Sequence, residues 1–381
     1  MRNRRVGRTG AVAVVVALWV VALDAGGASG VDRVVFQQGN ERRQSEGRVL
    51  VEAQDGGLLL LATDGVLWPL QPDQIVERDS DAQPFVPIGP KELAGRLRAE
   101  LPEGFDAIYT THYVILFNTS RAYAEWCASL FERLYMALTN YWNRRGFVLN
   151  EPEFPLVAVV FADRRGYLEH SRAELGQSAE SIIGYYHLQT NRMTMYDLTG
   201  MGASGSTAGV RHFLAQAEAA RSVATIVHEA VHQIAFNCGM HQRLSDCPLW
   251  FSEGVALYFE TPDLNSAKGW RGIGAINQPR LARWREYLRG RKPDSLKTLI
   301  ATDERFRDPK AALDAYAEAW ALTYFLLKSR PDQYLEYLRM LSRKLPLAED
   351  GPEKRIEEFQ AIFGDLERLD AELVRAMGRA G

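Results

Sequence analysis

Short apolar runs separated by turn residues fill the chain from residue 31 to residue 80. Each run holds five to seven residues, and the segments between them are rich in Gly, Asp, Asn and Gln. Runs of this length with such boundaries predict β-strands. We therefore expect residues 31–80 to form a small β-barrel-like module or a curled sheet, with a structural or docking role. The runs are RVVFQ, RVLVEA, GLLLLAT, VLWPL and QIVER.

Apolar residues at helical spacing become frequent beyond residue 80, mixed with a few strands in the middle of the chain. The proline-containing stretch 80–90 predicts a linker. Strands are expected at 106–120, at 155–162 and as a pair within 181–198, whereas the chain beyond residue 279 shows helical periodicity. This order predicts an α+β fold that ends in a helical subdomain. The expected helices outside the centre are 91–101, 121–145, 164–175, 279–290, 310–329, 331–344 and 353–378.

Two strongly apolar helices are predicted at the centre of the chain. The first begins near Arg221 and stops at 237–239, where Asn and Gly are typical of a helix C-terminus, and the second starts at Pro248. The loop between them is short and polar. We therefore expect the second helix to return antiparallel to the first.

The first of these helices contains the sequence HEAVH, residues 228–232. Histidines four positions apart lie on one face of a helix, where the imidazoles of His228 and His232 can bind one metal ion. Glu229 lies beside that face, in the place of a general base. A catalytic zinc site needs three protein ligands and one open position.

The third ligand distinguishes the classes of zinc enzyme. Metzincins require Gly and His three and six positions after the second histidine, but Ala235 and Cys238 stand there. The second helix instead supplies Glu253, 21 positions after His232, in LWFSEGVALYFE. Together with His228 it completes a His₂Glu set, the ligand type of thermolysin-like zinc sites.

HEAVH followed by WFSEGVALYFE resembles the gluzincin (peptidase MA-like) zinc metallopeptidases, and the second motif is closest to the aminopeptidase N family. The chain also resembles a group of uncharacterised exported bacterial proteins built on this core. The resemblance implies a zincin-like core, in which a mixed sheet supports the active-site helices, and one Zn²⁺ per chain. The matching positions are Trp250, Glu253, Gly254, Tyr258 and Glu260, while Ser252 replaces the usual Asn.

A third block, YAEAWAL from Tyr316, resembles the helix that carries the transition-state tyrosine of the aminopeptidase N family. The resemblance therefore implies Tyr316 as a catalytic residue beside Glu229. Glu260 either orients a metal-binding histidine or is a solvated charge at a helix end. The Gly-Ala-Met-Glu-Asn motif with which that family holds a substrate amine has no equivalent here, so aminopeptidase activity does not carry over.

Two segments before the metal-binding helix bear on substrate access. In zincins the strand at this point is the sheet edge that borders the cleft, and an extended peptide can pair with it. Our candidate for this strand is Arg192–Tyr196. The glycine-rich stretch 199–210 is expected to be a flexible loop, either a lid or a solvated insertion.

The cysteines and the remaining histidines receive structural interpretations. Cys238 and Cys247 flank the loop between the two central helices, and a disulfide there would fix the path that leads to Glu253. Cys127 is expected to be unpaired and buried in its helix. Structural or surface positions are expected for His112, His187 and His241, with substrate contact as the alternative for the last two.

Residues 1–30 have the layout of a secretory signal peptide, with an uncleaved anchor as the alternative. A basic start precedes an apolar run of 13 residues, from Ala11 to Leu23, and the small residues 28–30. We therefore expect a secreted or periplasmic protein without a membrane span after signal removal. Loss of four arginines and Asp24 changes the formal charge from −3 to −6, which leaves no basic surface for nucleic acid.

These features predict a zinc-dependent metallopeptidase that hydrolyses peptides or proteins outside the cytoplasm. Zinc would lower the pKa of its water toward about 7, Glu229 would take the proton, and Tyr316 would stabilise the oxyanion. The alternatives are a catalytically inactive envelope protein of gluzincin fold and a protease inhibited by its own β module. The expected organisation is a signal peptide at 1–30, the β module at 31–80, a linker and helix at 81–105, a zincin-like domain at 106–265 and a helical subdomain at 266–381.

Overall fold

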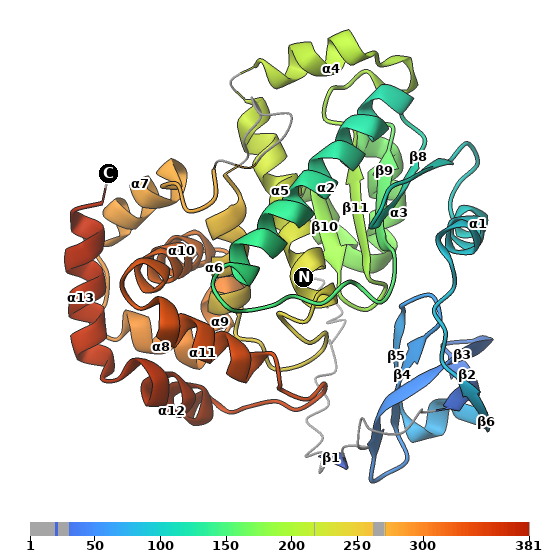
Figure 1. Cartoon of the computed structure of the whole chain (residues 1–381), viewed down its shortest axis with the longest axis horizontal. Coiled ribbons are helices and arrows are strands. Elements are labelled where there is room, and N and C mark those ends of the chain that lie inside the picture. Colours follow the sequence, from blue (N-terminus) through green and yellow to red (C-terminus); the bar gives the residue numbers. More distant parts are fainter. Residues whose placement is uncertain (1–19, 22–29, 217, 262–269, 271, 381) are drawn as a thin grey trace, which may run out of the picture.

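The computed structural model describes residues 20–21, 30–216, 218–261, 270 and 272–380. Figure 1 shows an α+β chain with a small β module at its N-terminal end, a central sheet flanked by helices, and a helical C-terminal region. This confirms the predicted fold class at that level. Of the predicted signal peptide, all but Val20, Val21 and Gly30 lies outside the described residues. Among the described residues, no helix is both long and apolar enough to cross a bilayer.

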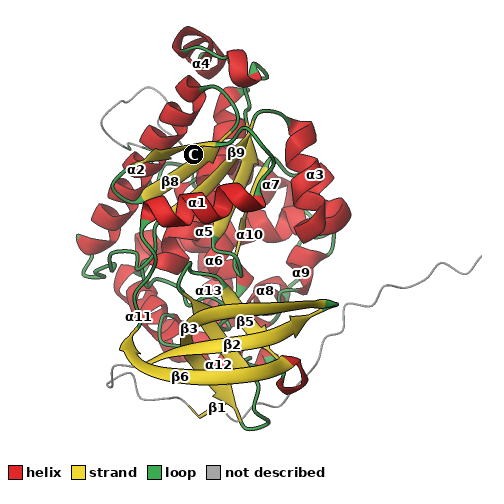
Figure 2. Ribbon diagram, turned by 90° about the vertical axis from the view of Figure 1, so that its right-hand side faces the viewer, coloured by secondary structure: helices red, strands yellow, loops and turns green. Residues whose placement is uncertain are grey.

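The β module is an antiparallel sheet in the order β5-β4-β3-β2-β6, and its strands coincide with the five predicted runs. Within the described part of the chain, β5 and β6 are its two edges, so it is a curled open sheet and not a closed barrel. Register shifts in β2 and β3 accompany the curvature that Figure 2 shows. The strands are β2 (Gly30–Gln38), β3 (Glu41–Ala53), β4 (Leu58–Ala62), β5 (Leu67–Leu70) and β6 (Ile75–Pro84), and the short β1 (Val20–Val21) pairs with β3.

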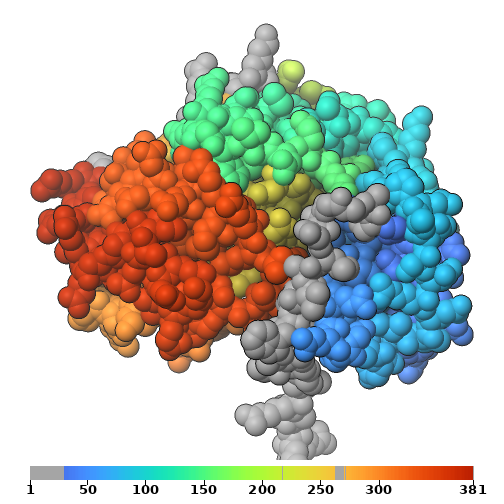
Figure 3. Space-filling view, turned by 60° about the horizontal axis from the view of Figure 1, so that its bottom comes forward, coloured from blue at the N-terminus to red at the C-terminus, as the bar shows by residue number. Residues whose placement is uncertain are grey.

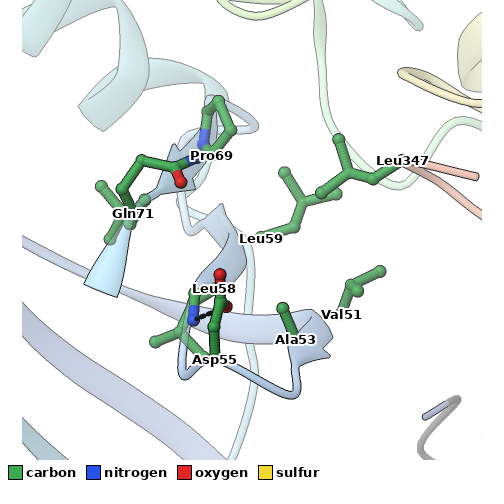
Figure 4. Close-up of a pocket in the computed structure, with 10 residues that line it drawn as sticks. Val51, Ala53, Asp55, Leu58, Leu59, Pro69, Gln71 and Leu347 are labelled. Atoms are coloured by element: carbon green, nitrogen blue, oxygen red, sulfur yellow. Dashed lines mark hydrogen bonds between the residues drawn. The ribbon is translucent and has the colours of Figure 1, made fainter. Parts of the chain in front are cut away.

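Both faces of the β module are apolar, which explains why β4 is buried along its whole length. One face forms a core within the module around Phe36 and Leu60. The other face, with Leu59 and Leu61, packs on Phe154 and Leu347 from the rest of the chain. The module is therefore docked on the body of the protein. A hollow of about 50 Å³ beside Leu347 (Figure 4) is too small for a substrate.

The central sheet has five strands in the order β10-β11-β9-β8-β7. Its inner strands β8, β9 and β11 are parallel, and the outer strands β7 and β10 run antiparallel to them. The predicted single strand at 106–120 is in fact two, because the chain turns at 110–112 to form a hairpin. The strands are β7 (Asp106–Tyr109), β8 (Tyr113–Phe117), β9 (Leu156–Phe161), β10 (Gly184–His187) and β11 (Arg192–Tyr196).

The predicted edge strand was wrong by one strand. Arg192–Tyr196 is β11, which lies between β9 and β10, so its backbone groups are used on both sides. The described edge of the sheet is β10. The pair of strands was predicted, but which of the two strands joins the rest of the sheet depends on pairing with β9, which lies far away in the sequence.

Helices cover both faces of this sheet (Figures 1 and 2). On one face lie α2 (Arg121–Asn143) and α5 (Ala219–Asn237), and on the other lie α1 (Pro90–Glu100) and α3 (Arg164–Leu175). The buried side chains of β8 alternate accordingly, with Ile115 facing α2 and α5 and Leu116 facing α1 and α3. This layer fixes α5, the helix that contains HEAVH, over β10 and β11 at one side of the sheet.

The glycine-rich stretch 199–210 is more ordered than predicted. A short 3₁₀ turn at Gly202–Ser204 precedes helix α4 (Thr207–Leu214), whose first turn is capped by the Ser206 side chain. The predicted helix 353–378 is divided in two, because Gly364 has a φ of +84° and Asp365 caps the next helix.

The C-terminal region consists of short helices around α10. Two of them, α8 and α9, were not predicted, because each contains too few residues to show a helical periodicity of apolar positions. The elements are α6 (Leu249–Phe259), α7 (Gln278–Tyr287), α8 (Ser295–Ala301), α9 (Glu304–Arg307), α10 (Ala312–Ser329), α11 (Pro331–Leu341), α12 (Pro352–Phe363) and α13 (Leu366–Gly378).

A buried ion-pair network fixes α10 in this region. Glu318, which is 0% exposed, accepts hydrogen bonds from Arg291 at 2.6 Å and Ser295 at 2.8 Å, and pairs with Arg305 at 2.8 Å. Arg291 also pairs with Asp370 of α13 at 2.5 Å. Because the network is enclosed, loss of one charge leaves the others without compensation.

We expect Glu318→Gln to lower the free energy of unfolding by about 3–5 kcal/mol, since two buried guanidinium groups lose their shared carboxylate. Urea denaturation followed by tryptophan fluorescence measures this change. The matched control is Glu336→Gln on the exposed side of α11, which we expect to change stability by less than about 0.5 kcal/mol. Equal stabilities of the two variants would show that the Glu318 network does not hold α10.

Candidate metal centre

The candidate site lies where α5 and α6 meet between the sheet and the C-terminal helices. In Figure 3, atoms of about residues 230–260 (yellow) are visible between the C-terminal helices (orange) and the green central part of the chain. Gly254 allows α6 to approach α10 closely, because a Cβ there would lie 2.1 Å from Thr323 Oγ1. This contact gives a physical reason for the glycine that follows Glu253 in the sequence.

Three side chains come together at this point. His228 Nε2 lies 3.2 Å from His232 Nε2 and 3.0 Å from Glu253 Oε2, and His232 Nε2 lies 3.5 Å from Glu253 Oε1. Ligands in a tetrahedral zinc site, with bonds of about 2.05 Å, are separated by roughly 3.3 Å. Among the described residues, this is the one group of His, Cys, Asp and Glu that can hold a metal ion. The donor set and its spacing therefore fit zinc, and zinc binding stays a prediction.

The three side chains are 11–13% exposed, so they are partly enclosed but not sealed from solvent. Burial of His228 works against its charged form, but the Glu253 and Glu260 carboxylates outweigh this effect and raise its pKa to about 10. For Glu253, burial would raise the pKa, but the neighbouring histidines outweigh it and lower the pKa well below its usual range. The metal-free site therefore holds a protonated imidazole beside a carboxylate.

Glu229 does not point into the group of three ligand atoms. Its Oε2 accepts a hydrogen bond of 2.9 Å from the backbone N–H of Tyr186, on the edge strand β10. Burial raises the pKa of Glu229, although the two histidines counteract this. A carboxylate with a raised pKa beside a metal site is suited to accept a proton.

Glu260 interacts directly with a predicted metal ligand, at the C-terminus of α6. Its Oε2 lies 3.1 Å from His228 Nδ1, and its Oε1 accepts hydrogen bonds from Asn277 Nδ2 at 2.7 Å and Arg280 Nε at 3.3 Å. With a side chain 10% exposed, it is not the solvated charge of the alternative interpretation. A carboxylate on the second nitrogen fixes the ring orientation and tautomer of a metal-binding histidine.

Asn277 and Arg280 were not identified as site residues from the sequence, although a helix was predicted from residue 279. Asn277 caps α7, and its side chain accepts from the Arg280 N–H at 3.3 Å. The polar residue Asn277 before Gln-Pro is the local signal of this helix start. That its side chain also reaches Glu260 depends on how α6 and α7 pack, which no local pattern contains.

Tyr316 lies on α10 at the same site. The negative charge of Glu253 raises its pKa, with burial and the charge of Glu229 as further causes. Its ring packs edge-on against Phe306 at 5.3 Å, and the Arg280 guanidinium lies 5.6 Å from its centroid. The phenol therefore remains protonated at neutral pH and close to both carboxylates.

The predicted disulfide is absent, because all three cysteines are free. Cys238 is buried beside Tyr135, whereas Cys247 Sγ lies 3.7 Å from His241 Nδ1. The loop is instead held by ion pairs of Arg355 with Asp246 and Asp303. As predicted, Cys127 is unpaired and buried.

Asp303 also fixes the start of α6. Its Oδ1 accepts a hydrogen bond from the Leu249 N–H at 3.0 Å, which satisfies one of the free donors at the helix N-terminus. Arg355 donates to the same oxygen at 3.0 Å. The direction in which Glu253 enters the site therefore depends on contacts from α12 and the residue before α9.

The histidines outside HEAVH have different environments. His241 was expected at the surface but is 2% exposed, packed between the rings of Phe236 and Phe251, and burial lowers its pKa to about 3. His112 contacts Glu132 at 2.7 Å, as a structural residue would. His187 contacts Thr190 at 3.1 Å in the turn after β10.

Residues 222–348, about a third of the chain, match a family model described as "Protein of unknown function (DUF1570)". No curated protein matches the chain. The matched segment begins in α5 and ends after α11, so it contains the three candidate ligands and Tyr316. The match agrees with the resemblance to an uncharacterised family, and it assigns no activity.

We expect Glu260→Gln to weaken zinc binding by about 10–100-fold, because His228 loses the carboxylate that orients its ring. Competition titration with a chromogenic chelator gives the dissociation constant. The control is Glu286→Gln on the exposed side of α7. Equal zinc affinity in Glu260→Gln and the wild type would show that Glu260 does not support zinc binding.

Zinc affinity should also depend on pH in a specific way. Because the pKa of His228 is raised to about 10 in the metal-free protein, a metal must displace its proton at neutral pH. We expect the apparent affinity to rise about tenfold per pH unit from about pH 7 to pH 9, with release of about one proton from this ring. Calorimetric titration in buffers of different ionisation enthalpy measures the release. A histidine of ordinary pKa, about 6.5, would instead give an affinity that levels off above pH 7.

Proposed function

We propose that this protein is a gluzincin-type zinc metallopeptidase that hydrolyses peptide bonds outside the cytoplasm. The observation that carries the proposal is the convergence of His228, His232 and Glu253 within 4.8 Å, with Glu229 directly beside them. The sheet with an antiparallel edge strand next to α5 supports a zincin-like core. The signal-like pattern of residues 1–30 supports export.

Each residue of the site has a role in this proposal. His228, His232 and Glu253 hold the metal, and Glu260 keeps His228 in the orientation that presents Nε2. When bound, zinc supplies a Lewis acid that polarises water and the substrate carbonyl. Glu229 takes the proton of the attacking water and passes it to the leaving amine.

Tyr316 provides the oxyanion donor. Burial and the surrounding carboxylates keep its hydroxyl protonated, so it can donate a hydrogen bond to the charge that develops on the carbonyl oxygen. Phe306 and Arg280 pack against its ring and restrict its position. The hydrogen-bond donor Tyr316 therefore comes from the C-terminal helical region, and the general base Glu229 comes from α5, the helix on the central sheet.

The edge strand β10, in place of β11, is the proposed docking strand for an extended substrate. The Tyr186 N–H points away from β11 toward Glu229, so the backbone groups of Gly184, two residues earlier, point to the same side. A peptide that pairs there would run beside the metal ligands. Main-chain recognition of this kind fits substrates that are peptides of varied sequence.

We expect Glu229→Gln to retain zinc and lose activity by about 10²–10⁴-fold, because the amide cannot accept the proton. The readout is the digestion of a peptide library by purified protein, together with its zinc content. Glu218→Gln, an exposed position at the start of the same helix, is the matched control and should leave activity unchanged.

A chelator should abolish cleavage by the wild-type protein, and added zinc should restore it. Full activity of Glu229→Gln would contradict the proposed role of Glu229. Absence of both bound metal and cleavage in the wild type would favour the catalytically inactive envelope protein instead.

A further inference from the structure

The turn that follows the edge strand β10 is held by residues from outside the central sheet. The Leu67 N–H, at the start of β5 in the β module, donates to the carbonyl oxygen of Gln189 at 2.8 Å. Arg243 Nη1 donates to the carbonyl oxygen of Leu188 at 3.2 Å and to that of Gly65 at 2.8 Å. One guanidinium group therefore joins the β module to the end of the edge strand.

Arg243 is an unusual residue to find in such a position. Its guanidinium is largely buried, and among the described residues it has no carboxylate partner at ion-pair distance. A buried cation without a counterion costs stability unless its donors are used in hydrogen bonds. Its hydrogen-bond acceptors are the carbonyl oxygens of Gly65 and Leu188, so its main contribution is to hold these two backbone segments together.

The clamped turn lies next to the backbone donor of the proposed general base Glu229. Leu188 is two residues after Tyr186, whose backbone N–H donates to Glu229. Next in the turn, Asn191 adopts a φ of +61° and exchanges side-chain hydrogen bonds with Asn237 at the end of α5. A shift of the turn would therefore move the donor that fixes Glu229.

β10 needs such support because it is short and has one neighbouring strand. Its four residues pair only with β11 in the described sheet, and on its outer side the Tyr186 N–H donates to Glu229. Edge segments of this kind exchange and fray more easily than central strands. A rigid β module docked at the end of β10 reduces that freedom.

The module is suited to this role because it is itself firmly docked. Arg48 of β3 forms a two-hydrogen-bond pair with Glu153 at 2.7 and 2.6 Å, and Leu59 and Leu61 pack on Phe154. These contacts hold the module in the place from which Leu67 reaches the turn. Arg42 of β3 offers a control, because its exposed side chain pairs at 3.9 Å with Glu77 of the same module and not with the body of the protein.

We propose that the N-terminal β module is part of the catalytic unit, and that Arg243 is a positioning residue that couples it to the edge strand beside Glu229. The inference rests on the proposed peptidase function for its effect on catalysis. The mechanical part, the restraint of β10 by Arg243 and the module, can be measured without any activity.

The test uses the full chain and compares Arg243→Ala, Arg243→Lys and the control Arg42→Gln. We expect Arg243→Ala to accelerate amide hydrogen exchange in peptides covering 184–191 by about tenfold or more, because the turn loses its clamp. Lysine keeps a donor in the same place and should restore most of the protection. Arg42→Gln should leave exchange at 184–191 unchanged.

Catalysis provides the second readout. We expect Arg243→Ala to lower kcat by about 10–100-fold with zinc content unchanged, since the base is displaced but the ligands are not. Arg243→Lys should recover part of this loss. If the wild type shows no hydrolysis, the proposed function fails, but the exchange measurement still decides whether Arg243 restrains β10.

A second variant covers the case in which Arg243→Ala does not fold. In Gly65→Ala the new Cβ would lie 3.1 Å from Phe154 at a φ of +85°, which displaces the Gly65 carbonyl while Arg243 stays intact. Faster exchange at 184–191 in this variant supports the coupling. Unchanged exchange in Gly65→Ala, or in a folded Arg243→Ala, would overturn the proposal.

Discussion

Compensation of buried negative charge is the constraint on which the candidate site depends. Glu229, Glu253 and Glu260 meet within one partly enclosed volume, and burial raises the free energy of each charged carboxylate. In the metal-free chain the compensation comes from a protonated His228 and from Arg280. A divalent cation between the histidines and Glu253 would provide the same compensation, and this is the physical argument for the metal that we propose.

The surrounding fold sets the positions of these charges from two directions. On one side, α5 is fixed across the sheet by apolar packing, so the two histidines have a rigid base. On the other side, Asp303 caps the N-terminus of α6, and Gly254 allows α6 to pack closely on α10. Glu253 on α6 and Tyr316 on α10 therefore lie on two helices that are packed against each other. Precise metal and substrate geometry requires supports of this kind, because a ligand on a mobile loop cannot keep distances of 3.0–3.5 Å.

The parts of the site that could be predicted are those set by local periodicity. Positions four apart on a helix share a face whatever the rest of the chain does, so HEAVH alone indicated that His228 and His232 would lie together. Predicting that Glu253 would lie near the two histidines required only a helix stop, a short loop and a helix start. The β module and most helices were also predicted, because their apolar patterns are local.

What could not be predicted depends on partners distant in the sequence. Glu260 is fixed by Asn277 and Arg280 across a helix–helix contact, and the order of β10 and β11 is decided by β9. The loop at 238–247 illustrates the same point. Two cysteines in a chain with a predicted signal peptide suggested a disulfide, but Arg355, more than a hundred residues later, holds this loop through Asp246.

The contacts that support Glu253 and the contacts that support the edge strand β10 differ in kind. The C-terminal network around Asp303 and Arg355 is ionic and buried, which suits a fixed ligand such as Glu253. The turn that ends the edge strand is held by the single guanidinium group of Arg243, and the outer side of β10 has no neighbouring strand in the described sheet. A strand that accepts an extended substrate, as we propose for β10, cannot be locked on its free side, so its restraint has to come from its end. The β module docks at that end, which gives an otherwise separate sheet a role in the proposed site.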